Sequence, residues 1–326
     1  MNNPSQTCVI FGGAGYCGRH WAIRLAGKKV FRRIVLADSR PPEVALPDQA
    51  DYIPCDVRKP IKLQLPDIHP DWIFNFAAIH REPGHAREEY FDTNLSGAKN
   101  VCAFAEQSGC KNIFFTSSIA VYGSLDKPTS ETSLPYPATP YGISKLCAEL
   151  IHKGWRKSGE DRRLYVCRPG VIYGPGDPGN ILRMIRAVRK GYFVFPGSKK
   201  LRKSYGYIEG LLDSFEFIMS SEEGQLTYNY VERETESLET LVRIVQEHFG
   251  RKIPTFTAPL PVLEAVAILA QMVTGGRSPI HPVRVRKTAS STHIIPELLL
   301  KMGFNFRYDF ATSLEDWAEK SPEDFS

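Results

Sequence analysis

Tyr141 and Lys145 are the residues of this chain whose types and spacing best suit chemistry. They lie four residues apart in 141–157, a segment with helical periodicity, so both side chains share one helix face. A phenol with a pKa of about 10 is a poor base, but a nearby ammonium favours the phenolate. Such a tyrosine can take the proton from a sugar or alcohol hydroxyl while hydride leaves the same carbon. Ser118, just beyond a predicted strand at 111–116, can hydrogen-bond the same oxygen.

The tyrosine–lysine pair alone also suits an exposed face of an amphipathic helix, because this spacing is common. A second motif favours catalysis. A short apolar strand at 8–11 runs into Gly12, Gly15 and Gly18, and a helix pattern follows over 19–27. A diphosphate can lie against free backbone N–H groups at such a helix start, where side chains would block it. The N-terminus therefore predicts a dinucleotide site.

Two carboxylates extend this prediction. Asp38 ends the second apolar strand, 33–37, twenty residues after Gly18, where a carboxylate accepts hydrogen bonds from an adenosine ribose. Asp56 follows a short strand near 52–53 and faces either the adenine crevice or solvent. A carboxylate at 38 would repel a 2′-phosphate, so we expect NAD rather than NADP, although Arg40 is able to pair with that phosphate.

Composition excludes several other classes. The formal charge of +5 is spread along the chain, and no basic run alternates with aromatic residues, so we expect no nucleic-acid partner. Seven cysteines show no metal spacing, so we expect no metal and a reduced, cytoplasmic protein. The polar start of the chain lacks the pattern of a signal peptide. The longest apolar stretch, near 262–273, is too short to span a bilayer.

Strands and helices alternate as far as residue 172, which predicts an α/β fold: a Rossmann-like, doubly wound parallel sheet. We expect residues 1–172 to form the NAD-binding domain, with a return to it near 205–235. Residues 173–326 would mostly form a smaller, mixed C-terminal substrate-binding lobe. Within this lobe, 261–274 predicts a helix that is apolar on most sides. We expect it to be buried lobe core rather than a helix for a partner.

Taken together, the motifs resemble those of the extended short-chain dehydrogenase/reductases, the group of NAD-dependent nucleotide-sugar epimerases and dehydratases. The resemblance spans nearly the whole chain. It rests on Gly12-x-x-Gly15-x-x-Gly18, Asp38, Asp56-Val57, Asn75-Phe76-Ala77-Ala78, Asn94, Ser117-Ser118, Val121-Tyr122-Gly123, Tyr141-x-x-x-Lys145, Arg168-Pro169-Gly170, Tyr207-Ile208-Glu209 and Leu300-Lys301-Met302-Gly303-Phe304.

The resemblance implies a catalytic Ser118, Tyr141 and Lys145, the strand order 3-2-1-4-5-6 with one added strand, and NAD as cofactor. The residues that we assign to cofactor contact are Gly12, Gly15, Tyr16, Cys17, Gly18, Asp38, Ser39, Arg40, Asp56, Val57, Ala77, Ala78, His80, Asn94, Ser117, Tyr141, Lys145, Pro169 and Gly170. Those assigned to the substrate are His80, Arg81, Ser118, Tyr122, Val171, Lys203, Tyr205 and Arg286, of which the last three could equally be surface residues.

Departures from the family pattern reduce the number of reactions that the chain is expected to catalyse. The dehydratases carry an Asp-Glu pair where this chain has Ile119 and Ala120, and decarboxylating relatives also need a carboxylate there. Many sugar-nucleotide members have asparagine in place of Val171. The 168–175 run is also similar to that of sterol and flavonoid reductases. The segment 78–82 favours epimerases of polysaccharide pathways.

We therefore expect an NAD-dependent nucleotide-sugar epimerase, acting at C4 through a 4-keto sugar, and a homodimer. The alternatives are an NAD(P)H-dependent 4-ketosugar reductase, a hydroxysteroid or alcohol dehydrogenase of the same superfamily, and a non-enzymatic NAD-binding module.

Overall fold

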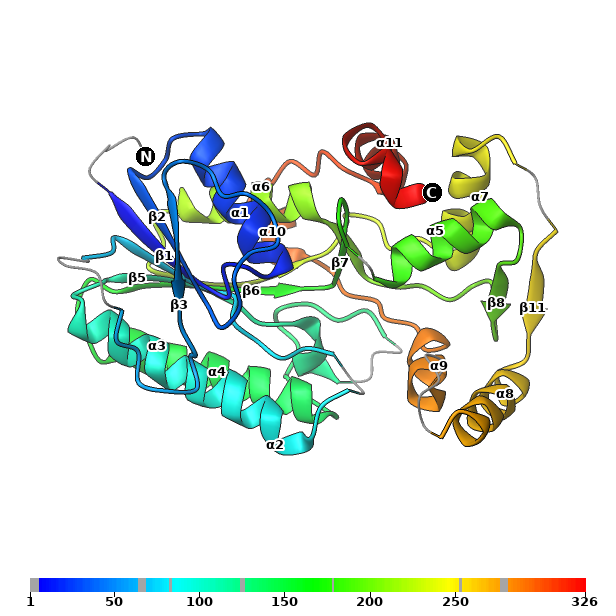
Figure 1. The fold of residues 1–326 in the computed structure, drawn as a ribbon, viewed down its shortest axis with the longest axis horizontal. Helices are drawn as coiled ribbons and strands as arrows, with labels where there is room; N and C mark the ends of the chain where they lie inside the picture. The colour runs from blue at the N-terminus through cyan, green and yellow to red at the C-terminus, as the bar shows by residue number, and fades with distance from the viewer. Residues whose placement is uncertain are drawn as a thin grey trace.

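The computed structural model describes residues 6–63, 69–81, 84–123, 127–177, 179–251, 254–275 and 281–326. Seven parallel strands form the central sheet (Figure 1), in the order β10-β6-β5-β4-β1-β2-β3. Their bounds are β1 Thr7–Phe11, β2 Arg33–Asp38, β3 Ala50–Pro54, β4 Trp72–Asn75, β5 Asn112–Thr116, β6 Arg163–Pro169 and β10 Gln225–Tyr230. This confirms the Rossmann-like fold class and the strand order with an added strand.

Each face of the sheet carries its own core because alternate side chains of a strand point to opposite faces. On one face, Cys8 and Ile10 pack with helices α1, Tyr16–Gly27, and α6, Ile208–Met219. On the other, Val9 and Phe11 pack with α3, Ser96–Gln107, and α4, Pro140–Lys157. Figure 1 shows these helix pairs above and below the strands. The carboxyl ends of the strands remain as the edge on which a site can form.

The long helical segment after β4 is interrupted by a π-turn. It consists of α2, Arg87–Tyr90, the π-helical turn η1, Phe91–Leu95, and α3. A π-turn inserts an extra residue into a helix, and such turns are frequent at functional sites. Asn94 lies in this turn.

The chain leaves the sheet after β6 and returns to it at β10. Between them, β7, Val171–Tyr173, pairs in parallel with β9, Tyr205–Tyr207. The same excursion carries α5, Asn180–Lys190, and β8, Val194–Pro196. After β10 come α7, Leu238–His248, β11, Phe256–Ala258, α8, Leu260–Val273, α9, Pro282–Thr288, α10, Glu297–Lys301, and α11, Phe310–Lys320. Among the described residues, no helix is long and apolar enough to cross a membrane.

The expectation for 261–274 was wrong. A helix forms there, α8, but Ala267 is its only buried residue, and Val266, Leu269 and Met272 are exposed. Periodicity predicted the helix correctly, yet it carries no information on whether another element covers the apolar side. The sequence analysis also missed α9 and α11. A capping box marks the start of α11, where Asp309 accepts a hydrogen bond of 2.8 Å from the backbone N–H of Thr312.

Candidate active site

The glycine turn after β1 is packed too closely for side chains. Gly12 has a φ of +74°, and a Cβ on it would lie 2.6 Å from the backbone nitrogen of Ala77. A Cβ on Gly18 would lie 2.4 Å from the carbonyl oxygen of Gly12. Gly15 is the N-cap of α1 and offers no capping side chain, so the first N–H groups of the helix face the turn. This arrangement suits a diphosphate.

Asp38 lies beside that turn. One carboxylate oxygen accepts a hydrogen bond of 3.1 Å from the backbone N–H of Ala14. The other accepts from the backbone N–H of Arg40 at 3.3 Å and from the hydroxyl of Ser39 at 3.4 Å. The carboxylate is half-buried at the end of β2, next to the first N–H groups of α1. The turn and this acid together fit the adenosine diphosphate half of NAD.

Tyr16 and Cys17 begin α1 on the side of the turn that faces the lobe. The Tyr16 hydroxyl is buried and has no hydrogen-bond partner among the described residues. A Cβ on Gly174 would lie 3.1 Å from it. Burial raises the pKa of the Cys17 thiol to about 12, so it is a neutral packing group.

Asp56 and Val57 follow β3. The Asp56 carboxylate accepts two hydrogen bonds from the Arg58 guanidinium, at 2.8 and 2.9 Å. These bonds hold the pKa of Asp56 below its ordinary value. Val57 is buried against Gly97, and its carbonyl oxygen accepts from Asn100 at 2.7 Å. Asp56 is thus engaged by its own loop, and its contact with an adenine stays a prediction.

Asn94 connects the segment after β4 to α4. Its side-chain oxygen accepts a hydrogen bond of 3.0 Å from the backbone N–H of Ile79. Its amide donates to the Ser144 hydroxyl at 2.9 Å. The half-buried Ala77 and Ala78 lie in the segment that Asn94 holds. Asn94 thus makes specific hydrogen bonds from within a helical segment, where its side chain would otherwise be unfavourable.

The structure brings Ser118 and the start of α4 together. Ser118 ends the extended chain after β5, and its hydroxyl accepts a hydrogen bond of 3.1 Å from the N–H of Ala120 in the turn η2, Ile119–Tyr122. Across from this turn, a Cβ on Gly142 would lie 2.4 Å from the carbonyl oxygen of Ala120. The first turn of α4, which carries Tyr141, therefore abuts the turn that carries Ser118. The Tyr141 ring lies 6.3 Å from that of Tyr90 in α2.

Lys145 is fully buried one turn further along α4, with its ammonium 4.4 Å from the centre of the Phe115 ring. Burial lowers its pKa to about 7, and the negative charge of Glu149 opposes that shift. Desolvation, with the charges of Arg81 and Lys145, lowers the pKa of His80. Lys145 is thus held in a poorly solvated place one turn along α4 from Tyr141, and its protonated form would favour the phenolate.

The sequence analysis missed a buried network beneath Lys145. Glu149 is fully buried and accepts two hydrogen bonds from Arg168 of β6, at 2.7 and 2.8 Å. Arg168 also donates to the Tyr122 hydroxyl at 2.8 Å, and this hydroxyl donates to Asn229 at 2.9 Å. The hydroxyl of Tyr122, a predicted substrate residue, therefore lies inside the network. The helical spacing of Lys145 and Glu149 was the available signal.

His152, which lies close to this network, was also not predicted from the sequence. Its ring stacks on Phe115 with centres 4.2 Å apart, and it is fully buried. Burial lowers its pKa to about 4, so the imidazole is neutral. The hydrogen-bond pattern assigns its tautomer: Nδ1 donates to the Ala148 carbonyl at 2.7 Å, and Nε2 accepts from Asn75 at 3.3 Å.

The crossing from β6 to β7 forms the rim on the lobe side. Ser117 and Pro169 lie at the ends of the neighbouring strands β5 and β6, and the Ser117 N–H donates to the Cys167 carbonyl at 2.6 Å. A Cβ on Gly170 would lie 2.3 Å from the Ser204 carbonyl oxygen. Val171 is 44% exposed next to it.

Three further predicted substrate residues lie on the lobe. Burial lowers the pKa of Lys203 to about 8, and its ammonium donates to the carbonyl of Ser290. Tyr205 is half-buried in β9, with its ring 6.4 Å from that of Tyr173. Arg286 lies on α9, is largely exposed and pairs with Glu264 of α8 at 2.6 Å. Glu82, in the segment at 78–82, lies outside the described residues.

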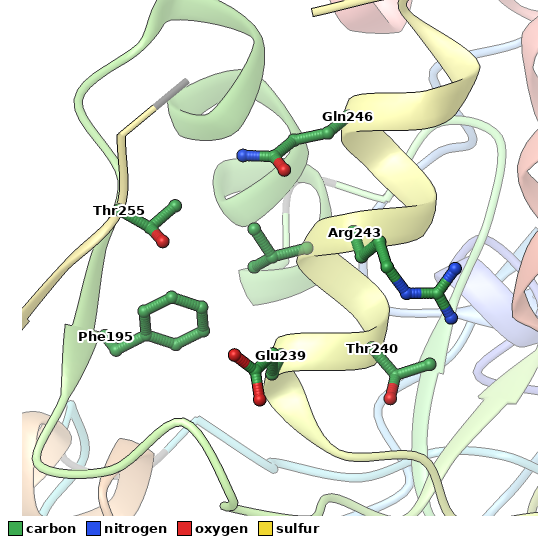
Figure 2. Close-up of a pocket in the computed structure, with 7 residues that line it drawn as sticks. Phe195, Glu239, Thr240, Arg243, Gln246 and Thr255 are labelled. Atoms are coloured by element: carbon green, nitrogen blue, oxygen red, sulfur yellow. The ribbon is translucent and has the colours of Figure 1, made fainter. Parts of the chain in front are cut away.

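A separate hollow of about 370 Å³ lies between α7 and the β8–β11 pair. Figure 2 shows Glu239, Thr240 and Gln246 on the helix, with Phe195 and Thr255 opposite. Its lining shares no residue with the Ser118–Tyr141–Lys145 cluster. All seven cysteines are free thiols, and the described residues contain no group of three His, Cys, Asp or Glu side chains that could hold a metal.

Comparisons with known proteins agree with this geometry. The profile of the NAD dependent epimerase/dehydratase family matches residues 8–230. The chain is 31% identical over 251 residues to the N-acetyl-alpha-D-glucosaminyl-diphospho-ditrans,octacis-undecaprenol 4-epimerase of Escherichia coli O157:H7, covering 75% of this chain and 76% of that protein. It is 26% identical to UDP-glucose 4-epimerase 4 of Oryza sativa subsp. japonica, covering 78% and 80%.

A solved structure shares the fold over the whole length. The UDP-N-acetylglucosamine 4-epimerase from Methanobrevibacter ruminantium M1 superposes with a TM-score of 0.76 at 18% identity, covering 98% of this chain and 99% of that one. The glycine turn and Asp38 have the geometry that suits a dinucleotide, and Ser118, Tyr141 and Lys145 lie at the same sheet edge. This chain is an NAD-dependent enzyme of the extended short-chain dehydrogenase/reductase type and belongs to the NAD-dependent epimerase/dehydratase family.

Proposed function

We propose that the enzyme epimerises a diphosphate-linked sugar at C4 through a transient 4-keto sugar. One observation carries the proposal: the packing of Gly142 on Ala120 places the first turn of α4, with Tyr141, against the turn that holds Ser118. Lys145 supplies positive charge from one turn further along the same helix. Tyr141 removes the proton of the C4 hydroxyl, and Ser118 hydrogen-bonds the same oxygen as it changes between alkoxide and carbonyl.

When bound, NAD would supply a reversible acceptor for the C4 hydride. Tyr141 gives its proton back when the hydride returns, so the two half-reactions use one tyrosine in opposite directions. Return to the other face of C4 requires the 4-keto sugar to turn over in the site. The small side chains of Ala77 and Ala78 are consistent with such movement.

The residues after Ser118 argue against loss of water from the sugar. Ile119 and Ala120 form the turn η2 and carry no acid, whereas β-elimination needs a carboxylate there. An enzyme that keeps the redox residues and lacks this acid fits a redox-neutral epimerisation best.

The carrier of the sugar is the second part of the proposal. A nucleoside diphosphate is the expected carrier, held by some of His80, Arg81, Ser118, Tyr122, Val171, Lys203, Tyr205 and Arg286. The relative from Escherichia coli acts on a sugar joined to undecaprenyl diphosphate. Val171 is exposed and stands where many family members have asparagine. This difference supports undecaprenyl diphosphate as a second possible carrier of the sugar. We further infer a homodimer located in the cytoplasm, with the division between cofactor domain and lobe near residue 172.

The decisive experiment incubates the purified protein, with no added cofactor, with UDP-, GDP-, CDP- and dTDP-sugars and with an undecaprenyl diphosphate sugar. The sugar is followed by NMR. Inversion at C4 with only co-purified NAD is the expected result. Turnover that consumes one equivalent of added NAD(P)H per sugar would establish a 4-ketosugar reductase, and oxidation of a hydroxysteroid with no change in any sugar would establish a steroid dehydrogenase.

A further inference from the structure

The helix α8 presents its apolar side to solvent. Val262, Val266, Leu269, Met272 and Val273 are all more than half exposed, reaching 67% at Met272 and 79% at Val273. Spacings of three and four residues place these five side chains on one helix face, which we call the α8 stripe. The buried Ala267 lies on the opposite side. At about 1.5 Å per residue, the helix is roughly 21 Å long, too short to span a bilayer and long enough to lie on one.

The helix next to the stripe is basic. Helix α9 has the sequence Pro-Val-Arg-Val-Arg-Lys-Thr, with three cations and no acid. Glu264, the one acid of α8, is mostly buried and is already paired with Arg286 of α9. Val283 of α9 is also exposed. An exposed apolar stripe next to a helix whose sequence carries Arg and Lys and no acid is the pattern of segments that lie in the interface of an anionic membrane.

The α8–α9 pair is joined to the rim of the active site. In Figure 1, α8 lies at the lower right, away from the sheet, and α9 lies between α8 and the sheet. The chain that leaves α9 runs along residues 202–204, where the Thr292 N–H donates to the Arg202 carbonyl at 2.9 Å and the Ile294 N–H donates to the Ser204 hydroxyl at 2.9 Å. The Ser204 carbonyl in turn accepts from the Val171 N–H at 2.9 Å. These hydrogen bonds link the chain that carries α8 and α9 to the substrate rim.

We propose that the α8 stripe docks on the surface of an anionic lipid bilayer, with α9 against the lipid headgroups. The inference goes beyond the proposed reaction and does not depend on which sugar the enzyme takes. A second copy of the chain is a poorer occupant. A two-fold contact across the stripe would bring the α9 cations of both copies together, and like charges repel at an interface.

The test measures co-sedimentation with vesicles, using the full chain. Native protein should sediment with phosphatidylglycerol-containing vesicles, bind pure phosphatidylcholine vesicles weakly, and be released by high salt. The double variant Val266→Glu/Leu269→Glu should bind the anionic vesicles at least about tenfold more weakly, because two aliphatic side chains no longer enter the interface.

A matched control carries the same two charges on apolar residues exposed elsewhere, Ile23→Glu/Tyr192→Glu, and should bind like the native protein. Both variants should keep the native thermal midpoint, and both should turn over a water-soluble substrate at the native rate.

Equal vesicle binding by the native protein and the stripe variant would overturn the proposal, as would no vesicle binding at all. Loss of a dimer in the stripe variant, without any effect on lipid binding, would assign the stripe to self-association. Failure of turnover in every protein would count against the proposed function and leave the docking result to stand separately.

Discussion

Lys145 is a cation in a place that disfavours charge. It is buried over the Phe115 ring, and its pKa falls to about 7 from an ordinary value of 10.5. The unfolded chain therefore binds more protons than the folded protein between about pH 7 and 10.5, so this group makes the protein more stable as pH rises through that window. Below pH 7 the full cost of burying the charge is present. The proposed chemistry needs the ammonium for Tyr141, whereas the stability of the fold would be greater without it.

Replacing Lys145 with methionine should separate these two effects. We expect Lys145→Met to abolish most turnover and to raise the melting temperature of cofactor-free protein at pH 6. The gain should shrink as pH rises toward 10, where the native lysine is neutral. Thermal unfolding of both proteins across this range measures it. The exposed Lys157→Met on the same helix serves as control and should show no such pH-dependent difference. A gain that grows with pH would contradict the assigned direction.

Tyr141 should contribute to proton transfer far more than to binding. We expect Tyr141→Phe to bind NAD nearly as well as the native enzyme and to lose most turnover, since only the hydroxyl is removed. Ser118→Ala should be milder, with roughly a 10²- to 10³-fold loss, as when one oxyanion donor is deleted. Titration calorimetry with NAD and steady-state assays measure the two quantities. Ordinary turnover by Tyr141→Phe would refute the assignment.

Asp38 should set the choice of cofactor. Its carboxylate already accepts from the N–H groups of Ala14 and Arg40, which fixes a negative charge beside the ribose position. We expect NAD to bind more tightly than NADP, and Asp38→Ser to reduce that preference because the repulsion of a 2′-phosphate is gone. Parallel titrations with both cofactors measure the ratio. Tighter binding of NADP by the native protein would show that Arg40 dominates.

At the scale of elements, the site depends on how closely α4 approaches the turn η2. A Cβ added to Gly142 would lie 2.4 Å from the Ala120 carbonyl oxygen. A Cβ added to Gly154, on the same helix, would meet open space. These two glycines of α4 therefore have opposite roles. One permits a backbone contact, and the other only weakens the helix.

Two alanine substitutions should reveal this difference. Gly142→Ala should destabilise the protein by about 1–3 kcal/mol through overpacking. It should also lower kcat, because it moves Tyr141 relative to Ser118. Gly154→Ala should stabilise by about 0.5–1 kcal/mol and leave kcat unchanged. Urea unfolding and kinetics of both variants test the pair. If Gly142→Ala were as stable and active as Gly154→Ala, the close approach of α4 to η2 would be disproved.

The elements that sequence predicted are those whose signal is local. The glycine turn, the strand ending at Asp38 and the helix with Tyr141 and Lys145 each carry their own pattern, and the structure places them at one sheet edge. The pairing of Glu149 with Arg168 joins residues of α4 and β6 that only the fold brings together. The exposure of α8 likewise depends on what the rest of the lobe leaves uncovered, which no pattern within 261–274 records.

At the scale of the whole molecule, Glu232 lies where the chain passes from the sheet into the lobe. It follows β10, is buried, and accepts a hydrogen bond from the Tyr173 hydroxyl of β7. Burial raises its pKa to about 8 from an ordinary 4.5. The folded protein therefore binds more protons than the unfolded chain between those values, and stability falls as pH rises through that range.

A neutral side chain of the same shape should remove this loss. Glu232→Gln should match the native protein in stability at pH 5 and exceed it at pH 9, because the native carboxyl must then ionise while buried. Denaturant unfolding of both proteins at the two pH values gives the comparison. Suppose instead that the variant is less stable than the native protein by the same amount at pH 5 and at pH 9. This result would show that Glu232 acts through its shape and hydrogen bonds and does not titrate between these pH values.

The strand β10 lies far along the sequence from its partner β6, and this separation has a genetic consequence. This strand pairs with β6 over six residues, from Gln225 opposite Leu164 to Tyr230 opposite Pro169, yet it is encoded after the whole excursion through β7, α5 and β9. A nonsense or frameshift mutation between codons 170 and 225 leaves the edge of β6 unpaired, with Val166 and Cys167 no longer covered. Such alleles should all be complete nulls, although they would still encode the glycine turn, Asp38, Ser118 and Tyr141.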